Sequence, residues 1–399
     1  MTITLTKMQD EAVLRVLDWL VKRDKPVFKL FGYAGTGKTT IAKQIAKAAA
    51  RQSEMDHPVK FAAYTGKAAS VLRRKGCDGA TTIHQLIYKP MDRRCDHCGF
   101  IMADNVRHVP EKPGRCRSEV GESVVEFALR HNGLNANTTR LVIIDECSMV
   151  GRKVGEDLLS FGIPILVLGD PAQLPPVGDG GFFTEGEPDV LLTEIHRQEE
   201  GCGVLDIATA VRTGRRLVVG DYSESAVRHL SAISTIDAFG FDQVICGTNK
   251  SRAWWNARMR QALGRTSPLP EPMDKLICTQ NNHDLKLMNG EMVIVHEVSK
   301  VTEWNLRLGF VREGASPGNV EYCDCDRHYF DGKPGKPDYA GDGTAVFDFG
   351  YAITCHKSQG SQWGRVLVHN ESRTFRDDAA RWLYTAVTRA EDHVTVLGA

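Results

Sequence analysis

The segment GYAGTGKT, from Gly32 to Thr39, has the residue types and the spacing of a loop that binds phosphate. It fits the pattern G-x-x-x-x-G-K-S/T and lies between an apolar run, VFKLF, and a helical pattern that begins at Lys38, which is the setting that this pattern requires. Backbone N–H groups and the positive end of the helix can hold phosphate oxygens, while Lys38 neutralises them and Thr39 coordinates magnesium. The alternative, a purely structural glycine turn, would not need Lys and Thr at these places. The predicted nucleotide contacts in this loop are Gly35, Thr36, Gly37, Lys38, Thr39 and Thr40.

Two adjacent carboxylates, Asp145 and Glu146, end the apolar run RLVIIDE. Neighbouring residues at the end of a strand can point in different directions, so Asp145 can hold magnesium while Glu146 directs an attacking water. The alternative is an aspartate that caps a helix beside a surface glutamate, and this motif by itself leaves it open. Beside a phosphate loop, the pair favours hydrolysis over phosphoryl transfer to a small acceptor.

The segment LVLGDPAQLPPV places Asp170 and Gln173 directly after another apolar run. Side chains that follow a strand leave the carboxyl edge of a parallel sheet, where ligands bind. Gln173 is therefore a candidate sensor of a terminal phosphate. Taken alone, the segment is more typical of a proline-rich turn with an exposed glutamine, and the presence of the two other motifs reverses that preference.

The elements that must position these residues alternate between strand and helix. Apolar residues three and four apart between Thr6 and Lys22 predict a helix with one buried face. Apolar runs at VFKLF, KFAAYT, RLVIIDE and PILVLGD, separated by helical stretches, predict a parallel sheet covered on both faces. A second pattern of this kind starts at DQVICGTNK and continues through RVLVHN and HVTVL. The predicted fold class is α/β, with two parallel-sheet domains expected at residues 1–185 and 186–399.

Two segments interrupt this alternation. At about residues 88–120 the composition changes to Arg, Cys, His, Pro and Gly with little periodicity, which predicts an insertion that projects from the first domain. A region rich in Gly, Pro and Asp with short strands, at about residues 275–349, predicts a small β-barrel-like insertion in the second domain.

The first of these insertions contains a candidate zinc site. Cys95 and Cys98 form a C-x-x-C pair, and His108 and Cys116 follow as two further ligands that could complete a tetrahedron around zinc. Because one C-x-x-C is only moderately specific, reduced surface thiols remain the alternative. A zinc ion would stabilise a segment that has too few apolar residues to fold alone.

The composition limits the class of protein. A chain of 399 residues exceeds what one hydrophobic core usually supports, and 42% hydrophobic and 25% charged residues are typical of globular proteins. No apolar run approaches the ~20 residues that span a bilayer, and the N-terminus lacks the pattern of a signal peptide, so we expect no membrane segment and a cytoplasmic protein. Lys+Arg and Asp+Glu both total 50, which argues against a wholly basic surface. Eleven cysteines without a secretory context favour reduced thiols or a metal site over disulfides.

Eight segments occur in the order found in the superfamily 1 helicases: GYAGTGKT, AAYTGKAAS, TTIHQL, VIIDECSMV, LVLGDPAQLPPV, LTEIHRQ, YAITCHKSQG and LYTAVTRAED. The chain resembles most the RecD-like and Dda-like branch of this family. The resemblance implies two RecA-like domains of the P-loop NTPase class with ATP and Mg²⁺ between them. It also implies ATP-dependent movement on single-stranded DNA with 5′ to 3′ polarity. The insertion after TTIHQL is placed where this family carries its strand-separating pin.

The resemblance assigns further nucleotide contacts. Arg389, in YTAVTRAED, would be an arginine finger, and Arg197, in LTEIHRQ, would be a second arginine that contacts phosphate. For each arginine a surface salt bridge is the alternative. Gly360 would lie close to the nucleotide. Gln9 would recognise adenine, although T-x-x-Q, from Thr6 to Gln9, is also a capping box in which the amide satisfies only the backbone.

The family's DNA contacts map onto YTGKAAS, TTIH and ITCHKSQ, and the residues carried over are Thr65, Lys67, His84, Thr354 and His356. Hydroxyl groups, a lysine and backbone amides suit phosphate contacts, which position a strand without reading its sequence. For each of these residues a polar surface position is the alternative. The expected partners are single-stranded DNA, duplex junctions and replication or repair proteins. Two other functions stay open: a nucleotide-gated DNA-binding subunit that does not unwind, and a small-molecule kinase.

Overall fold

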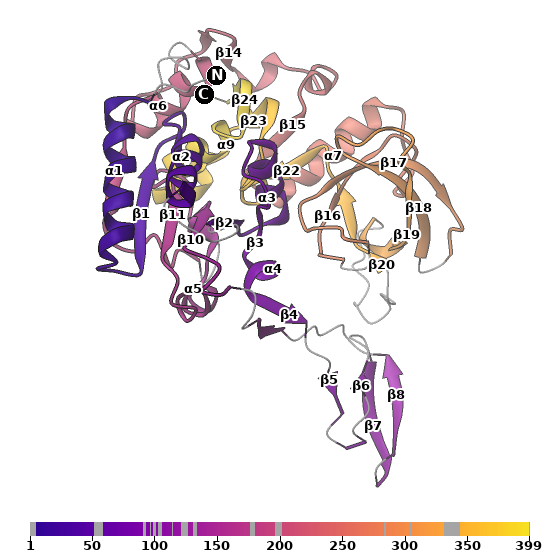
Figure 1. Cartoon of the computed structure of the whole chain (residues 1–399). Helices are drawn as coiled ribbons and strands as arrows, with labels where there is room; N and C mark the ends of the chain where they lie inside the picture. Colours follow the sequence, from indigo (N-terminus) through magenta and orange to yellow (C-terminus); the bar gives the residue numbers. More distant parts are fainter. Residues whose placement is uncertain are drawn as a thin grey trace. The chain divides into compact units, whose positions relative to one another are not determined.

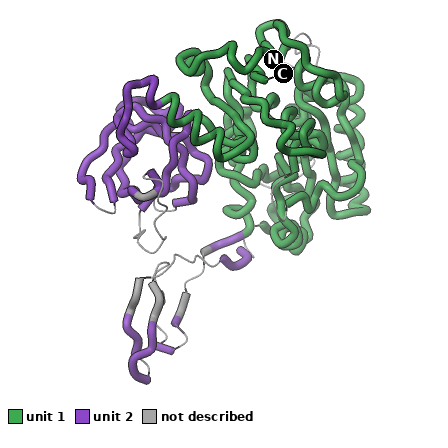
Figure 2. The backbone as a smooth tube through the Cα atoms, turned by 180° about the vertical axis from the view of Figure 1, so that it is seen from behind, with its two compact units in different colours: residues 1–87, 131–259, 352–399 green, residues 88–130, 260–351 purple. Residues whose placement is uncertain are grey.

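The computed structural model of the chain describes residues 5–51, 59–90, 93–95, 97–98, 101–102, 106–113, 115–120, 127–130, 134–175, 180–195, 202–282, 285–302, 305–330 and 344–398. These residues form two compact units (Figure 2). Unit 1 comprises residues 1–87, 131–259 and 352–399, and unit 2 comprises residues 88–130 and 260–351. Among the helices in the described ranges, none is long and apolar enough to cross a lipid bilayer.

The first sheet of unit 1 has six strands, and every neighbouring pair is parallel. Its central strands are buried almost completely, as expected when helices cover both faces of a parallel sheet. In spatial order the strands are β12 (Val190–Leu192), β1 (Val27–Gly32), β11 (Ile165–Gly169), β10 (Leu141–Asp145), β2 (Val59–Ala63) and β3 (Thr81–Thr82).

Helices α1 (Lys7–Lys22), α2 (Lys38–Arg51) and α3 (Gly66–Arg74) pack with this sheet around one hydrophobic core (Figure 1). Helix α1 begins with the predicted capping box, in which the side chains of Thr6 and Gln9 each accept a hydrogen bond from the other's backbone N–H. Two shorter helices, α4 (Ile83–Ile87) and α5 (Arg152–Leu159), complete this part of the chain.

The second sheet of unit 1 also has six strands, and only its β13–β14 edge pair is antiparallel. The strand order is β13 (Gly220–Tyr222), β14 (Ser225–Arg228), β24 (Ala390–Leu397), β23 (Trp363–His369), β15 (Gln243–Cys246) and β22 (Ala352–Thr354). The helices are α6 (Gly203–Arg212), α7 (Asn249–Ala262), α8 (Cys355–Ser358) and α9 (Ala379–Val387), of which α6 and α9 pack against each other and against β24. The predicted pair of parallel-sheet domains is confirmed. The limits at residues 1–185 and 186–399 stay a prediction, because both sheets lie in one compact unit.

The predicted β insertion is a separate, mostly antiparallel sheet in unit 2 with its own hydrophobic core. Its strands are β16 (Lys275–Cys278), β17 (Met292–Ser299), β18 (Asn305–Arg312), β19 (Glu321–Asp326), β20 (Thr344–Ala345) and β21 (Phe347–Phe349). Next to β16, the fully buried carboxylate of Asp274 accepts hydrogen bonds from Arg260, Arg265 and the Tyr351 hydroxyl. These ion pairs and the hydrogen bond connect the segments that precede and follow the β insertion.

The described residues of the Cys-rich insertion form three two-stranded antiparallel pairs, all in unit 2 (Figure 2). The chain enters along β4 (Tyr88–Pro90) and leaves along its partner β9 (Phe127–Leu129). Between them lie the pair β5 (Arg93–Arg94) and β6 (Ile101–Met102) and the pair β7 (Val106–Lys112) and β8 (Arg115–Val120). Among the side chains whose burial is described between residues 88 and 130, only that of Cys95 is buried.

Candidate active site

The predicted phosphate loop joins the end of β1 to the start of α2. Gly35 and Gly37 have φ angles of 76° and 77°, in the left-handed region that glycine adopts without strain. At Gly37 a side chain would also come within 2.7 Å of the amide nitrogen of Gln9. The Lys38 amino group donates to the carbonyl oxygens of Gly32, at 2.6 Å, and Tyr33, at 2.9 Å. The loop therefore encloses one positive charge at the beginning of a helix.

A pocket of about 630 Å³ lies over this loop, and residues from both sheets of unit 1 line it. Its volume lies in the range of small-molecule sites. The first sheet supplies all six predicted loop residues together with Asp145, Glu146, Asp170 and Gln173. The second sheet and its helices supply Gly360, Gln362, Thr388, Arg389, Ala390, Glu391 and Asp392. These predicted nucleotide contacts are thus brought together. Gln9 is not among the residues that line the pocket, and Arg197 lies outside the described residues.

The two strand-end carboxylates have different environments. Asp145 ends β10, and burial, followed by repulsion from Glu146, raises the pKa of its carboxyl group to about 6. Its Oδ1 accepts a hydrogen bond of 2.9 Å from the backbone N–H of Glu146. Glu146 has a left-handed backbone, with φ 52° and ψ 48°, a conformation that is uncommon for a residue with a side chain and is concentrated at functional sites. This turn separates the two carboxylates.

Glu146 contacts two polar residues from distant parts of the chain. Its Oε1 lies 3.7 Å from Nη1 of Arg389. With the amide of Gln173 assigned so that its nitrogen faces the carboxylate, Gln173 donates to Glu146 Oε2 at 3.2 Å and accepts from Arg389 Nη2 at 3.1 Å. We call these three residues the carboxylate–amide–guanidinium cluster.

Arg389 lies between α9 and β24 and is only 2% exposed. It also donates to the carbonyl oxygens of Thr385, at 3.1 Å, and Ser361, at 3.4 Å. The alternative of a surface salt bridge is therefore wrong for Arg389. Its predicted role as an arginine finger stays a prediction, as does that of Arg197, which lies outside the described residues.

Tyr384, on α9, joins the phosphate loop to the loop after β11. Its hydroxyl donates to Asp170 Oδ2 at 2.8 Å and accepts from the backbone N–H of Ala34 at 2.8 Å. Two neighbouring contacts fix the same region: Thr385 Oγ1 accepts from the N–H of Leu174 at 2.7 Å, and the Gln359 amide donates to the Leu174 carbonyl at 2.8 Å. Sequence reasoning missed these three side chains, although they lie within the motifs from which Thr354, His356, Gly360 and Arg389 were assigned.

Gln9 is 3% exposed, and both atoms of its amide have backbone partners. The oxygen completes the capping box, and the nitrogen donates to the carbonyl oxygen of Thr36 in the phosphate loop at 3.0 Å. The capping-box alternative is therefore present. Recognition of adenine by Gln9 stays a prediction.

Gly360 approaches helix α3 closely. Its φ is 74°, and a side chain there would come within 2.9 Å of Thr65 Oγ1. Thr65 caps α3 by accepting from the N–H of Ala68 at 3.1 Å. The Lys67 amino group lies over the ring of Trp363, 4.2 Å from its centroid. Thr65 and Lys67, two predicted DNA contacts that belong to the part of the chain around the first sheet, thus lie beside Gly360 and Trp363 of the second sheet's part.

The remaining predicted DNA contacts are partly or fully buried. His84 lies on α4 with its ring edge-on to Tyr64, and the ring of His356, on α8, lies 5.9 Å from that of Phe375. Burial lowers the pKa of both histidines, so their rings are neutral at pH 7. Thr354, directly before α8, is 9% exposed. Contacts of all five predicted residues with DNA stay predictions.

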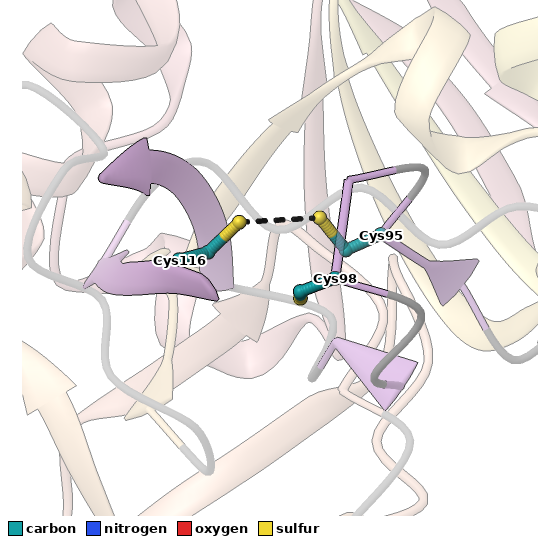
Figure 3. Close-up of side chains that lie close together, drawn as sticks. All are labelled: Cys95, Cys98 and Cys116. Carbon is teal, nitrogen blue, oxygen red and sulfur yellow. Dashed lines mark hydrogen bonds between the residues drawn. The ribbon is translucent and has the colours of Figure 1, made fainter. Parts of the chain in front are cut away.

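Three of the four predicted zinc ligands lie together (Figure 3). The sulfur atoms of Cys95, Cys98 and Cys116 are all within 4.8 Å of one another, and those of Cys95 and Cys116 are 3.7 Å apart. The backbone of His108 pairs with Ser118 on β8, but its side chain lies outside the described part of the structure. Zinc binding and the role of His108 stay predictions.

Comparison with known proteins identifies two domains. The family described as AAA domain matches residues 4–237, more than half of the chain. The UvrD-like helicase C-terminal domain matches residues 349–397, which include Gly360 and Arg389.

Two of the relatives are named as ATP-dependent DNA helicases. The chain is 26% identical to the ATP-dependent RecD2 DNA helicase of Deinococcus radiodurans, over 91% of this chain and 46% of that protein. It is 27% identical to the ATP-dependent DNA helicase dda of Enterobacteria phage T4, over 62% of this chain and 54% of that protein. The chain spans about half the length of these relatives. A solved structure of Pif1 helicases at forked double-stranded DNA has a TM-score of 0.51 at 18% identity, covering 98% of this chain and 92% of that one. These findings confirm the resemblance that the motifs predicted and the two-domain α/β fold.

Proposed function

The chain belongs to the AAA domain family, and we propose that it is a DNA helicase that hydrolyses ATP in the pocket of unit 1 and moves along single-stranded DNA. The observation that carries this proposal is the carboxylate–amide–guanidinium cluster. It joins a strand-end carboxylate of the first sheet to a buried arginine that precedes the last strand of the second. An enzyme that uses ATP hydrolysis to move one domain against another needs such a link, because it makes the chemistry depend on the position of both.

Each residue of the pocket has a separate role in the transfer of the terminal phosphoryl group to water. Backbone N–H groups of the loop and the Lys38 amino group hold the phosphates. Glu146 accepts the proton of the attacking water, and Gln173 fixes the orientation of the Glu146 carboxylate. Arg389 offers two N–H groups to the charge that develops on the terminal phosphoryl group, so its contribution is greatest in the transition state. Arg197 would add a second positive charge.

Two metal ions belong to the proposal. Thr39 and Asp145 offer the hydroxyl and carboxylate oxygens that Mg²⁺ prefers. Burial and repulsion from Glu146 destabilise the negative charge of Asp145, and a divalent cation bound beside it would stabilise that charge. When bound there, Mg²⁺ would neutralise phosphate charge. The second ion is zinc, for which the proposed ligands are Cys95, Cys98 and Cys116, with His108 as the predicted fourth ligand.

Movement on DNA would follow from the contacts between the two sheets. The bonds of Tyr384, Thr385 and Gln359 to the first sheet would form and break as the nucleotide is bound and released, so that the grip on DNA passes between the two domains. Thr65, Lys67, His84, Thr354 and His356 are the proposed contacts with the strand. The proposed polarity is 5′ to 3′, because the motifs resemble the RecD-like and Dda-like branch. The Cys-rich insertion follows α4 directly and is the proposed strand-separating pin.

The proposed partners are single-stranded DNA and duplex junctions, with replication or repair proteins, and the proposed location is the cytoplasm. The test measures ATP turnover with and without single-stranded DNA, and strand displacement on duplexes with either a 5′ or a 3′ tail. We expect DNA to stimulate turnover and only the 5′-tailed duplex to be unwound.

Substitution Lys38→Ala should lower turnover roughly a thousandfold, because it removes the charge that faces the phosphates. Lys43→Ala, on the same helix but outside the pocket, is the matched control and should retain parent activity. DNA-stimulated turnover without displacement would support the passive DNA-binding subunit, and phosphorylation of a small acceptor without DNA stimulation would support the kinase.

A further inference from the structure

The described side chains of the Cys-rich insertion form no hydrophobic core that would hold its strands together. Among the side chains whose burial is described between residues 88 and 130, Cys95 alone is buried. The β insertion of the same unit, by contrast, encloses a cluster of buried residues that includes Leu306, Leu308, Phe310 and Phe347. Segments of about 40 residues without a core usually depend on a metal ion or a disulfide for their fold. The question is which chemical link replaces the core.

The three cysteines come from two different hairpins (Figure 3). Cys95 and Cys98 lie in the turn that joins β5 to β6, and Cys116 lies on β8, paired with Pro110 of β7. The first link between the turn and the hairpin is the pair of sulfur atoms of Cys95 and Cys116, which lie 3.7 Å apart. A second link ties the same turn to the hairpin, since the His97 ring bonds to the carbonyl oxygen of Lys112 at 2.8 Å.

The spacing of the sulfur atoms suits a metal better than a disulfide. Zinc–sulfur bonds of about 2.3 Å in a tetrahedron place the sulfur atoms about 3.8 Å apart. The distance between the sulfurs of Cys95 and Cys116 is 3.7 Å. A disulfide would need about 2.05 Å.

We infer that a zinc ion held by Cys95, Cys98 and Cys116 takes the place of a hydrophobic core in the insertion and makes it a rigid pin. The metal joins the β5–β6 turn to the β7–β8 hairpin, so both lose their fixed arrangement when it leaves. The fold of the pin therefore depends on zinc, whereas the nucleotide pocket of unit 1 does not. The consequence for unwinding rests on the proposed helicase function, and the binding of zinc does not.

Metal content tests the site directly. Protein purified from cells supplied with zinc should contain about one zinc per chain, and Cys95→Ser or Cys116→Ser should lower this roughly tenfold or more. Cys202→Ser is the control for metal content, because Cys202 is the other described cysteine that is partly exposed and it lies in unit 1. Parent protein without zinc, or with a Cys95–Cys116 disulfide in mass spectrometry, would overturn the inference, and so would iron in place of zinc.

Proteolysis and unwinding test the role of the metal. After chelation, trypsin should cleave within residues 88–130 roughly tenfold faster, and added zinc should restore protection. With Mg²⁺ supplied in excess after chelation, DNA-stimulated ATP turnover should stay within about twofold while displacement of 5′-tailed duplex falls roughly tenfold. Unwinding at the parent rate by zinc-free protein would refute the pin. If zinc and protection are present but no variant unwinds DNA under any condition, the metal site stands and the helicase proposal fails.

Discussion

Replacing Arg389 with alanine separates catalysis from binding more clearly than any other change in the pocket. The guanidinium group contacts Glu146 and Gln173 together with two backbone carbonyls, and none of these contacts involves the phosphate loop. The loop and Lys38 are expected to provide most of the binding energy of the nucleotide. We therefore expect the affinity for ATP and for single-stranded DNA to change by less than about tenfold.

The expected loss in turnover is roughly a thousandfold, which corresponds to about 4 kcal/mol of transition-state stabilisation. A cost in stability accompanies it, because the substitution leaves the half-buried carboxylate of Glu146 without its cation. The Glu146 side chain is 24% exposed, so the loss in the free energy of unfolding should be about 1–3 kcal/mol. This is less than the cost of breaking a fully buried ion pair. The substitution Arg389→Lys should fall between parent and alanine, because lysine keeps the charge but not the two-pronged geometry.

The assay is single-turnover ATP hydrolysis, combined with nucleotide binding and a thermal melt of each variant. Arg381→Ala is the matched control: Arg381 lies on α9, the helix that precedes Arg389, its side chain is 53% exposed, and its partner Asp378 lies 3.3 Å away. Such an exposed pair contributes at most about 1 kcal/mol, so turnover should stay within twofold of the parent. If Arg389→Ala hydrolyses ATP and unwinds tailed duplex at the parent rate, the arginine has a structural role and the reasoning fails.

Two other substitutions test the surroundings of the pocket. Tyr384→Phe should raise the KM for ATP roughly tenfold, because it removes the hydroxyl group that bonds to the phosphate loop. The control Tyr351→Phe removes a similar bond to a buried carboxylate in the β insertion and should lower Tm without changing KM. Equal KM values for the two variants would contradict this prediction. The pKa of the Asp145 carboxyl group is raised to about 6 in the folded protein, so its negative charge opposes folding above that pH. Asp145→Asn should therefore raise Tm at pH 7.5 and abolish turnover. The gain in Tm should shrink as the pH falls from 6 to 4, because the carboxyl group of the parent protein is then increasingly protonated. A lower Tm than the parent at pH 7.5 would show that the carboxylate is not destabilising.

The parts of the site that could be predicted are those in which the chemistry lies within a short segment. The phosphate loop needs eight consecutive residues, and its glycines, lysine and threonine are all visible in the sequence. Arg389 could be placed only through the resemblance, because nothing near it in the chain shows what it contacts. Tyr384 was missed for the same reason: its hydroxyl reaches Ala34, 350 positions earlier, and a tyrosine within an apolar helix is usually part of the core.

The fold shows the same division. Long apolar runs predicted the central strands, whereas β3 and β12, with two and three residues, are too short to have a period of their own. Gln9 shows a further limit, since its one amide both completes a capping box and bonds to the phosphate loop. Local spacing shows the first contact, and only the structure shows the second.

The points at which the two insertions interrupt the chain also have an evolutionary consequence. Each insertion begins and ends on strands that pair with one another, with Tyr88 opposite Leu129 in one and Leu276 opposite Phe349 in the other. The first and last residues of each insertion are therefore adjacent. A change in the length of an insertion should have little effect on the stability of the rest of the chain. Each insertion is a cassette that recombination can exchange, lengthen or shorten. In this way an insertion can change while the residues that line the pocket of unit 1 stay the same.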